Sequence, residues 1–378
     1  MGRKTQPETH RLPPLPHERM ARRIPAIAEE LPRWLELATS RGLQDRVLLD
    51  EDFEKHLEEV PKLALEWAHG VYRAGIYELE SAIWQGDLLI SHLQYVFNHA
   101  LHHRRTFWVD ESLAWMLADT ELDVIGDALR LPFPVSCFAF TDARTLDLCH
   151  RVFAAFDPED AHRPKSVAAY ALRGPERDGH RLVRIYFLLD DHEPERWPVL
   201  LSRDLWYGAE DDLATVLRSR RDDLGGKPDP FWTLPEVVDL VHLVINCVLY
   251  TTCSHFTQIL KRSPLRAATS GARPSGRAGR RLRRQQGRLA PRFSSDDVFH
   301  LPGPIPIDRL RKHEACEPEP NGGRLTKRFM VRGHWRRANP SWTDQRLRWV
   351  EPYWKGPDMA AAIERQYRLK GPAATSAG

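Results

Sequence analysis

The chain has 378 residues, 42% hydrophobic and 28% charged, an ordinary globular composition with room for two cores or one large core with appendages. Five cysteines without a paired spacing argue against a disulfide framework, which needs an even number and an oxidising compartment. The most apolar stretch, 237–256, contains Asp239, His242 and Asn246, which argues against a membrane span, and residues 1–22 lack the apolar core of a signal peptide. We therefore expect a cytoplasmic protein without a membrane partner.

Apolar residues at helical spacing dominate the first third of the chain. The spacing predicts helices over 20–37, 53–72, 76–103 and 111–118, with the second interrupted at Pro61.

Runs rich in Val, Ile, Tyr and Phe follow and are typical of strands. They predict strands over 134–140, 166–172, 182–189 and 197–202. Asp178-Gly179 predicts a tight turn between the second and third of these. Two helices are predicted next, over 209–218 and 234–260, the latter apolar enough to pack on one face of the sheet. Three short strands are predicted after them, over 298–307, 326–335 and 345–354.

These elements place the chain in the α+β class. We expect N-terminal helices, then a mostly antiparallel sheet with a buried helix, and a C-terminal β-hairpin. The expected divisions are a polar leader (1–16), a helical region (17–130), an α+β core (131–260), a disordered arginine-rich loop (261–295), a basic aromatic β segment (296–357) and a tail (358–378).

Charge divides the chain into an acidic body and a basic C-terminal third. Residues 255–378 hold 26 Lys plus Arg against 10 Asp plus Glu, whereas residues 1–254 hold 29 against 42. Within the basic part, residues 261–295 contain 11 basic residues, no acidic one and too little apolar surface to order themselves. The segment is either a linker of no consequence or an arm that neutralises phosphates. Its candidate contact residues are Arg280, Arg281, Arg283 and Arg284.

Motifs for metal, nucleotide and acyl chemistry are missing. No CxxC or HExxH completes a zinc site around Cys149-His150 or Cys253-Ser254-His255. No Walker-type glycine loop, GxGxxG or GxSxG is present. We therefore expect no metal and no cofactor.

The segment 327–356, KRFMVRGHWRRANPSWTDQRLRWVEPYWKG, combines guanidinium groups with indole rings on two predicted strands. Guanidinium groups pair with phosphates, and aromatic faces stack on unpaired bases, so the hairpin is a candidate platform for single-stranded RNA. The alternative is that Trp335, Trp349 and Trp354 anchor the sheet and the arginines merely flank them. The candidate contact residues are Arg328, Arg332, His334, Trp335, Arg336, Arg337, Arg346, Arg348, Trp349, Trp354 and Lys355.

His334 supports a second hypothesis, that of an RNA-cleaving enzyme. The ordinary pKa of histidine lies near neutrality, so this side chain could act as a general acid or base. A third possibility is an interaction module of a phage or plasmid whose acidic body binds another protein.

Three stretches resemble the second family of type V-A anti-CRISPR proteins. They are TFWVDESLAWMLADTELDVIGDALRLPFPVSCFAFTD (106–142), DLVHLVINCVLYTTCSHF (239–256), and the tail VRGHWRR…LRWVEPYW. In that family a strand-like start, an aspartate-led helix and a Leu-Pro step precede an aromatic strand. The tail is similar to the family's closing pattern, in which a basic His-Trp motif precedes an Arg-Trp-x-x-Pro strand.

The resemblance implies a regulatory factor carried on mobile elements, which include plasmids and phages. Members recognise the nascent N-terminus of the type V-A effector nuclease and cause loss of its message. RNA, a ribosome–nascent chain complex or a nascent polypeptide would then be the partner, with Arg332, His334, Trp335, Arg348 and Trp349 as the contact residues. The N-terminal helices and the arginine-rich loop lie outside the family pattern and leave the target open.

Overall fold

The computed structural model describes residues 25–75, 78–156, 164–190, 199–218, 234–253, 265–266, 297–301, 328–331, 333–355 and 362–363. Its helices are α2 (Pro25–Ser40), α3 (Glu51–His56), α4 (Glu59–Arg73), α5 (Leu79–Leu101), α6 (Glu111–Ala118), α7 (Ala143–Phe156), α8 (Leu213–Arg218) and α9 (Pro235–Thr252), with the 3-10 turn η1 (Gly126–Ala128). Its strands are β1 (Thr106–Val109), β2 (Val135–Phe140), β3 (Ser166–Arg177), β4 (His180–Asp190), β5 (Val199–Gly208), β6 (Leu265–Arg266), β7 (Asp297–Leu301), β8 (Arg328–Val331), β9 (His334–Arg336), β10 (Arg348–Val350), β11 (Tyr353–Lys355) and β12 (Ala362–Ile363).

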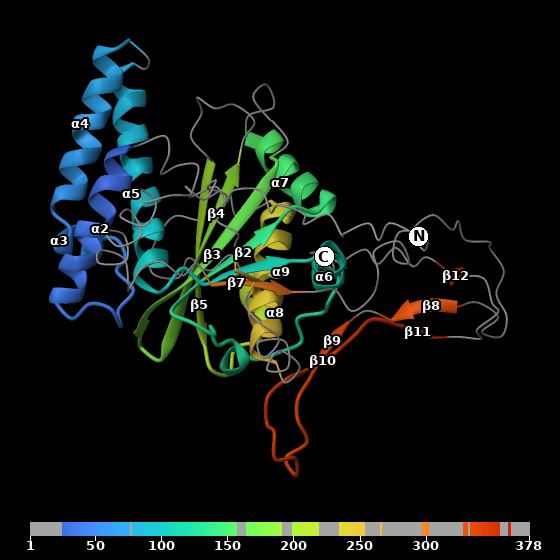
Figure 1. Cartoon of the computed structure of the whole chain (residues 1–378). Helices are drawn as coiled ribbons and strands as arrows, with labels where there is room; N and C mark the ends of the chain where they lie inside the picture. The colour runs from blue at the N-terminus through green and yellow to red at the C-terminus, as the bar shows by residue number, and fades with distance from the viewer. Residues whose placement is uncertain are drawn as a thin grey trace, which may run out of the picture.

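A mixed sheet in the order β5-β4-β3-β2-β1-β7-β6 forms the centre of the fold. Strands β2 to β5 pair antiparallel, and β1 runs parallel to both β2 and β7. Helices α2 to α5 cover one face of this sheet, and α6 to α9 cover the other (Figure 1). The α+β class and the mostly antiparallel sheet are thus confirmed.

Each face of the sheet buries alternate residues of the same strands. In β3, Ala168 and Tyr170 pack toward α5, whereas Val167 and Ala169 pack toward α9. Because side chains alternate along a strand, a strand buried on both faces must be apolar at nearly every position. This explains the unbroken apolar run at the start of β3.

The tight turn at Asp178-Gly179 is confirmed. Both residues have positive φ values, 51° and 76°. Such a pair is typical of the two-residue turn that matches the twist of a β-hairpin, and glycine adopts it without steric cost.

Several predicted boundaries differ from the structure. The second predicted helix divides into α3 and α4 at Leu57 and Glu58 rather than at Pro61, which lies in the first turn of α4, where a backbone N–H has no helical acceptor. Helix α8 begins at Leu213, later than the predicted start. The four-residue strand β1 and helix α7 were not predicted as elements. The Asp142 carboxylate, which accepts from the Thr145 backbone N–H at 2.9 Å, is the start signal of α7.

The arginine-rich segment lies largely outside the described residues. Only Leu265–Arg266 is described there, as strand β6 paired antiparallel with β7. Arg280, Arg281, Arg283 and Arg284 are therefore known from sequence alone. Among the described helices, none has the length and apolar character needed to cross a membrane.

Candidate nucleic-acid interface

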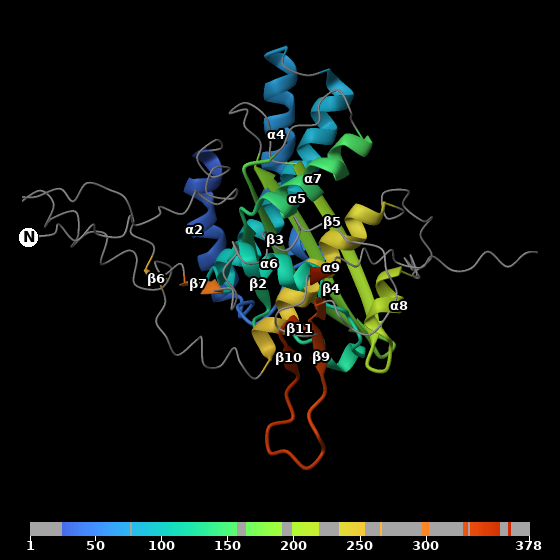
Figure 2. The ribbon, with the colours of Figure 1, turned by 90° about the vertical axis from the view of Figure 1, so that its right-hand side faces the viewer.

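The C-terminal hairpin extends from the body of the protein, as Figures 1 and 2 show. The part next to the loop 337–347 pairs β9 with β10 antiparallel, with Trp335 opposite Trp349 and Arg336 opposite Arg348. The part farther from this loop pairs β8 with β11 antiparallel. The two predicted strands of this region therefore exist, but each is divided into two.

The division falls where the hairpin backbone meets the body. The Glu121 N–H donates to the Gly333 carbonyl at 3.1 Å, in place of a bond within the hairpin. A side chain at Gly333 would approach the Thr120 hydroxyl to 2.7 Å and the Trp349 indole nitrogen to 3.1 Å. Only glycine permits this close approach.

The two paired indoles face the interior. Trp335 is 5% exposed and Trp349 is 4% exposed, and both belong to the core cluster around α9. An indole ring buried in this way cannot stack on a base. The prediction that Trp335 and Trp349 form the stacking platform is therefore wrong for the folded protein, because hydrophobic burial against α9 takes precedence over solvent exposure.

Asn246 of α9 holds this inner face with its side-chain amide. The Trp335 indole N–H donates to the Asn246 Oδ1 at 2.8 Å. The Asn246 Nδ2 in turn donates to the Leu117 and Thr120 carbonyls at 2.9 and 3.1 Å. The Trp349 indole N–H donates to the Thr120 hydroxyl at 3.3 Å. Buried polar groups cost free energy unless paired, so this network fixes the hairpin in one orientation on the end of α6.

The outer face of the same hairpin presents cations around a third tryptophan. The guanidinium carbons of Arg336 and Arg348 lie 5.6 and 4.0 Å from the ring centroid of Trp342. Arg336 is exposed, whereas Arg348 and Trp342 are half-buried. The ring thus holds two guanidinium groups by cation–π attraction.

Two further arginines lie near the tip. Arg337 is exposed. Arg346 binds the Asp344 carboxylate with two hydrogen bonds of 2.9 and 2.8 Å. These bonds from Arg346 lower the pKa of Asp344 to about 2. Arg346 is therefore partly neutralised, whereas Arg336 and Arg348 are the cations of the outer face, and Arg337 is an exposed cation next to them in the chain.

The remaining candidates are only partly described. Arg328 belongs to β8, and Trp354 and Lys355 belong to β11, but their side chains lie outside the described part, as does all of Arg332. His334 is half-buried on β9, and its backbone forms an isolated parallel β-bridge with that of Glu121. Its role as a general acid or base stays a prediction. Within the described segments, no three His, Cys, Asp or Glu side chains gather so as to hold a metal ion.

Sequence reasoning missed Trp342, Asn246 and Thr120. Trp342 follows the turn residues Asn339, Pro340 and Ser341, and an aromatic side chain in a turn between two arginine-rich strands was the available signal. An amide within the apolar run 243–249 of α9 was the signal for Asn246, because such a group needs a buried partner.

The arrangement defines a class of protein: a three-layer α+β body that carries a basic hairpin, anchored by buried indoles. Residues 107–357 match the family model described as AcrVA2-like, Anti-CRISPR type V subtype A2 family. The chain belongs to this family. Among solved structures, the crystal structure of AcrVA2 is similar at 14% sequence identity and a TM-score of 0.47, covering 89% of this chain and 96% of that chain. A comparison with curated proteins finds no match.

Proposed function

We propose that this protein is an anti-CRISPR factor of a mobile element that binds a translating message, or its nascent peptide, and so lowers expression of the target. Membership of the type V subtype A2 family supports the anti-CRISPR role. The observation that carries RNA contact is the pairing of Arg336 with Arg348 beside Trp342 on the outer face of a projecting hairpin.

Like charges directly opposite on neighbouring strands destabilise a sheet. Arg336 and Arg348 are such a pair, and the Trp342 ring only partly offsets their repulsion. A phosphate backbone would offset it further, because guanidinium groups form charge-assisted hydrogen bonds with phosphate oxygens. The buried indoles on the inner face hold both cations in place before a ligand arrives, which reduces the entropy cost of binding.

The RNA contact is tested with a triple variant, Arg336→Ala, Arg337→Ala and Arg348→Ala. Filter binding to labelled single-stranded RNA is measured over a range of salt concentrations. Because each lost phosphate contact lowers the slope of log K against log salt by about 0.7 for a single strand, the slope should fall by about 2. A matched variant that replaces the exposed Arg33, Arg41 and Arg130 on the body should keep the parent slope.

A double variant, Arg336→Lys and Arg348→Lys, separates charge from guanidinium geometry. It should keep most of the salt dependence but lose affinity, because an ammonium group cannot pair bidentately or stack as a guanidinium does. Equal binding by the parent, the triple variant and the body variant would remove the hairpin from the RNA contact.

Expression in cells distinguishes message from peptide. The protein is produced together with a type V-A effector nuclease, and the amount of effector message is measured by quantitative reverse transcription. One reporter carries synonymous codons at the start of the effector gene, and another carries an altered N-terminal peptide. Loss of regulation in the first reporter indicates recognition of RNA sequence, and loss only in the second indicates recognition of the peptide. An unchanged message and protein level with the parent reporter would contradict the proposed function.

A further inference from the structure

Helices α4 and α5 form an antiparallel pair that extends beyond the sheet at the end where α4 finishes and α5 begins (Figures 1 and 2). They are in close contact at Gly86, where a Cβ atom would lie 3.3 Å from both the Ala64 carbonyl oxygen and the Ala68 Cβ. The C-terminal half of α5, with Leu93 and Phe97, belongs to the core cluster on the sheet. One end of the pair is therefore fixed on the body, and the other end projects from it.

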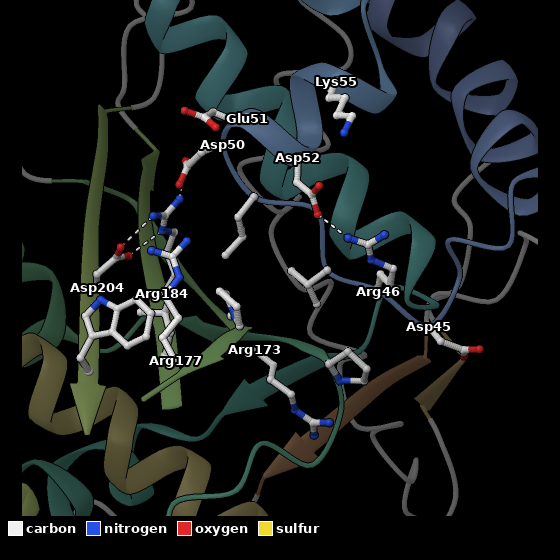
Figure 3. A pocket seen from close by; sticks show the side chains of 17 residues that line it. Asp45, Arg46, Asp50, Glu51, Asp52, Lys55, Arg173, Arg177, Arg184 and Asp204 are labelled. Carbon is white, nitrogen blue, oxygen red and sulfur yellow. Dashed lines mark hydrogen bonds and ion pairs between the residues drawn. The ribbon is translucent and has the colours of Figure 1, made fainter. Parts of the chain in front are cut away.

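Ion pairs hold the base of this helical layer against the sheet. Arg184 of β4 donates to Asp204 of β5 at 2.5 and 2.7 Å and to Asp50, next to α3, at 2.5 Å (Figure 3). Arg46 binds Asp52 of α3 at 2.6 Å. The projecting end thus keeps a defined position relative to the body.

The projecting end exposes large apolar side chains. The described part of the chain has five such exposed side chains, and only Tyr353 lies outside these two helices. The other four are each 47–53% exposed and are called here the apolar flank: Leu65 and Tyr72 of α4, and Leu79 and Ile83 of α5. Clustered apolar side chains at a surface mark an interaction site, whereas scattered ones do not.

The helical repeat places all four on the same side of the contact between the helices. On α4, Leu65 and Tyr72 lie three positions before and four positions after Ala68. On α5, Ile83 lies three positions before Gly86, and the fourth side chain is one turn earlier. Residues three or four apart share a helix face, and the two helices run antiparallel, so both rows border the same side of the seam.

The charged side chains beside the apolar flank differ in sign between the helices. On α4 they are Lys62 and Arg73, both exposed. On α5 they are Glu80 and Asp87, also exposed, three positions before and four positions after Ile83. Within the described segments, no ion pair engages any of these four charges. The flank therefore has a basic rim along α4 and an acidic rim along α5.

We propose that the apolar flank binds a second copy of this chain, with α4 of each copy lying on α5 of the other. A two-fold axis parallel to the helices produces this arrangement, because it exchanges the two helices across the interface. It places the basic rim of each copy opposite the acidic rim of the other. With the helix contact at Gly86 as the reference, Arg73 lies level with Glu80 of the second copy, and Lys62 lies within one turn of Asp87 of the second copy.

This matching of the two rims distinguishes a second copy from other occupants. A nucleic acid would meet the acidic rim of α5 and be repelled. The contact covers one side of two helices, which is at the small end of specific interfaces, so we expect a dissociation constant on the order of 10 μM. Such a contact adds little to the stability of either copy at lower protein concentrations.

Sedimentation velocity of the nuclease-treated, full-length protein tests the dimer, at concentrations from about one-tenth to ten times that dissociation constant. The parent protein should change from monomer to dimer over this range. Ile83→Glu should raise the dissociation constant at least about tenfold, because it places a carboxylate in the apolar contact of both copies. Tyr353→Glu is the matched control: this side chain is similarly exposed but lies on the hairpin, and the variant should dimerise as the parent does.

A charge exchange tests the orientation of the two copies. Arg73→Glu and Glu80→Arg should each weaken the dimer about tenfold, because two-fold symmetry turns two attractive contacts into repulsive ones. The combination of both changes should restore the parent association. Glu66→Arg changes an exposed charge on the side of α4 that faces away from α5 and should have no effect.

Each variant is first checked for an unchanged melting temperature at low concentration. The hairpin triple variant should still dimerise, so a failure of the RNA proposal and a failure of this one give different results. A monomer at every concentration would overturn the proposal, even if the flank captured a different protein in an Ile83-dependent way. So would a dimer that Ile83→Glu leaves intact, or a charge exchange that fails to restore association.

Discussion

Two long helices, α5 and α9, lie on opposite faces of one sheet and are held there by different interactions. The buried face of α9 is apolar over nearly its whole length, and Asn246 is its main polar member. The corresponding face of α5 buries polar side chains at many positions: His92, Gln94, Asn98 and His99. The α9 layer is thus held mainly by packing, and the α5 layer also by directional hydrogen bonds.

The polar contacts of α5 join it to both the sheet and the preceding loop. The Tyr186 hydroxyl donates to the Gln94 side-chain oxygen at 2.6 Å, and the rings of Tyr95 and Tyr170 lie 4.8 Å apart. Burial raises the pKa of Tyr186 to about 12, so its hydroxyl remains a donor at neutral pH. Because each such bond has only one good geometry, this layer has a more closely specified position than a purely apolar one.

The largest expected effect is a loss of stability in the α9 layer, which is held mainly by apolar packing. Leu249→Ala removes a fully buried side chain from α9 and leaves a cavity in the core. The free energy of unfolding should fall by about 2–5 kcal/mol, measured by urea denaturation. The matched change on the other layer, Leu65→Ala, alters a side chain that is 53% exposed and should shift stability by less than about 0.5 kcal/mol. Equal effects would contradict the assigned core.

A slightly smaller loss of stability is expected from a change in the α5 layer, which is also held by hydrogen bonds. Asn98 exchanges two hydrogen bonds with the Leu48 backbone, at 2.9 and 2.7 Å, and donates to the Gln94 carbonyl at 2.8 Å. Asn98→Leu leaves the Leu48 N–H and carbonyl unpaired in the interior. We expect a loss of about 2–4 kcal/mol, because each buried unsatisfied group costs about 1–3 kcal/mol. A neutral result would show that the loop around Leu48 is held by packing alone.

A change at Asn246 tests the main polar side chain on the buried face of α9. Asn246→Leu removes the acceptor of the Trp335 indole and both donors to the end of α6. We expect a loss of about 1–3 kcal/mol, together with faster protease cleavage in residues 337–347. If Asn246 served only α9, the hairpin would resist protease as in the parent protein.

The fold was largely predictable because its signals are local. Helix Glu111–Ala118 was predicted residue for residue, since the Asp110 side chain caps it and accepts from the Ser112 N–H at 2.9 Å. The interface was only half predictable. Alternation separates Arg348 from Trp349, but it does not tell which face meets the body. That depends on the Trp335–Asn246 bond, which joins residues 89 positions apart.

The smallest expected effect is a loss of stability at acidic pH that arises in the α5 layer. Burial lowers the pKa of His102 below its ordinary value of 6.5, and its Nε2 lies 3.0 Å from the Arg46 carbonyl. The unfolded chain therefore binds a proton more readily than the folded protein does, so stability should be constant above neutrality and fall as pH drops below about 6.5. On the other face, burial raises the pKa of Asp142, so acidification relieves the cost of its buried charge there. His102→Gln should flatten the loss of stability between neutral and mildly acidic pH, as measured by thermal denaturation. An unchanged slope in that variant would assign the acid-induced loss of stability to a group other than His102.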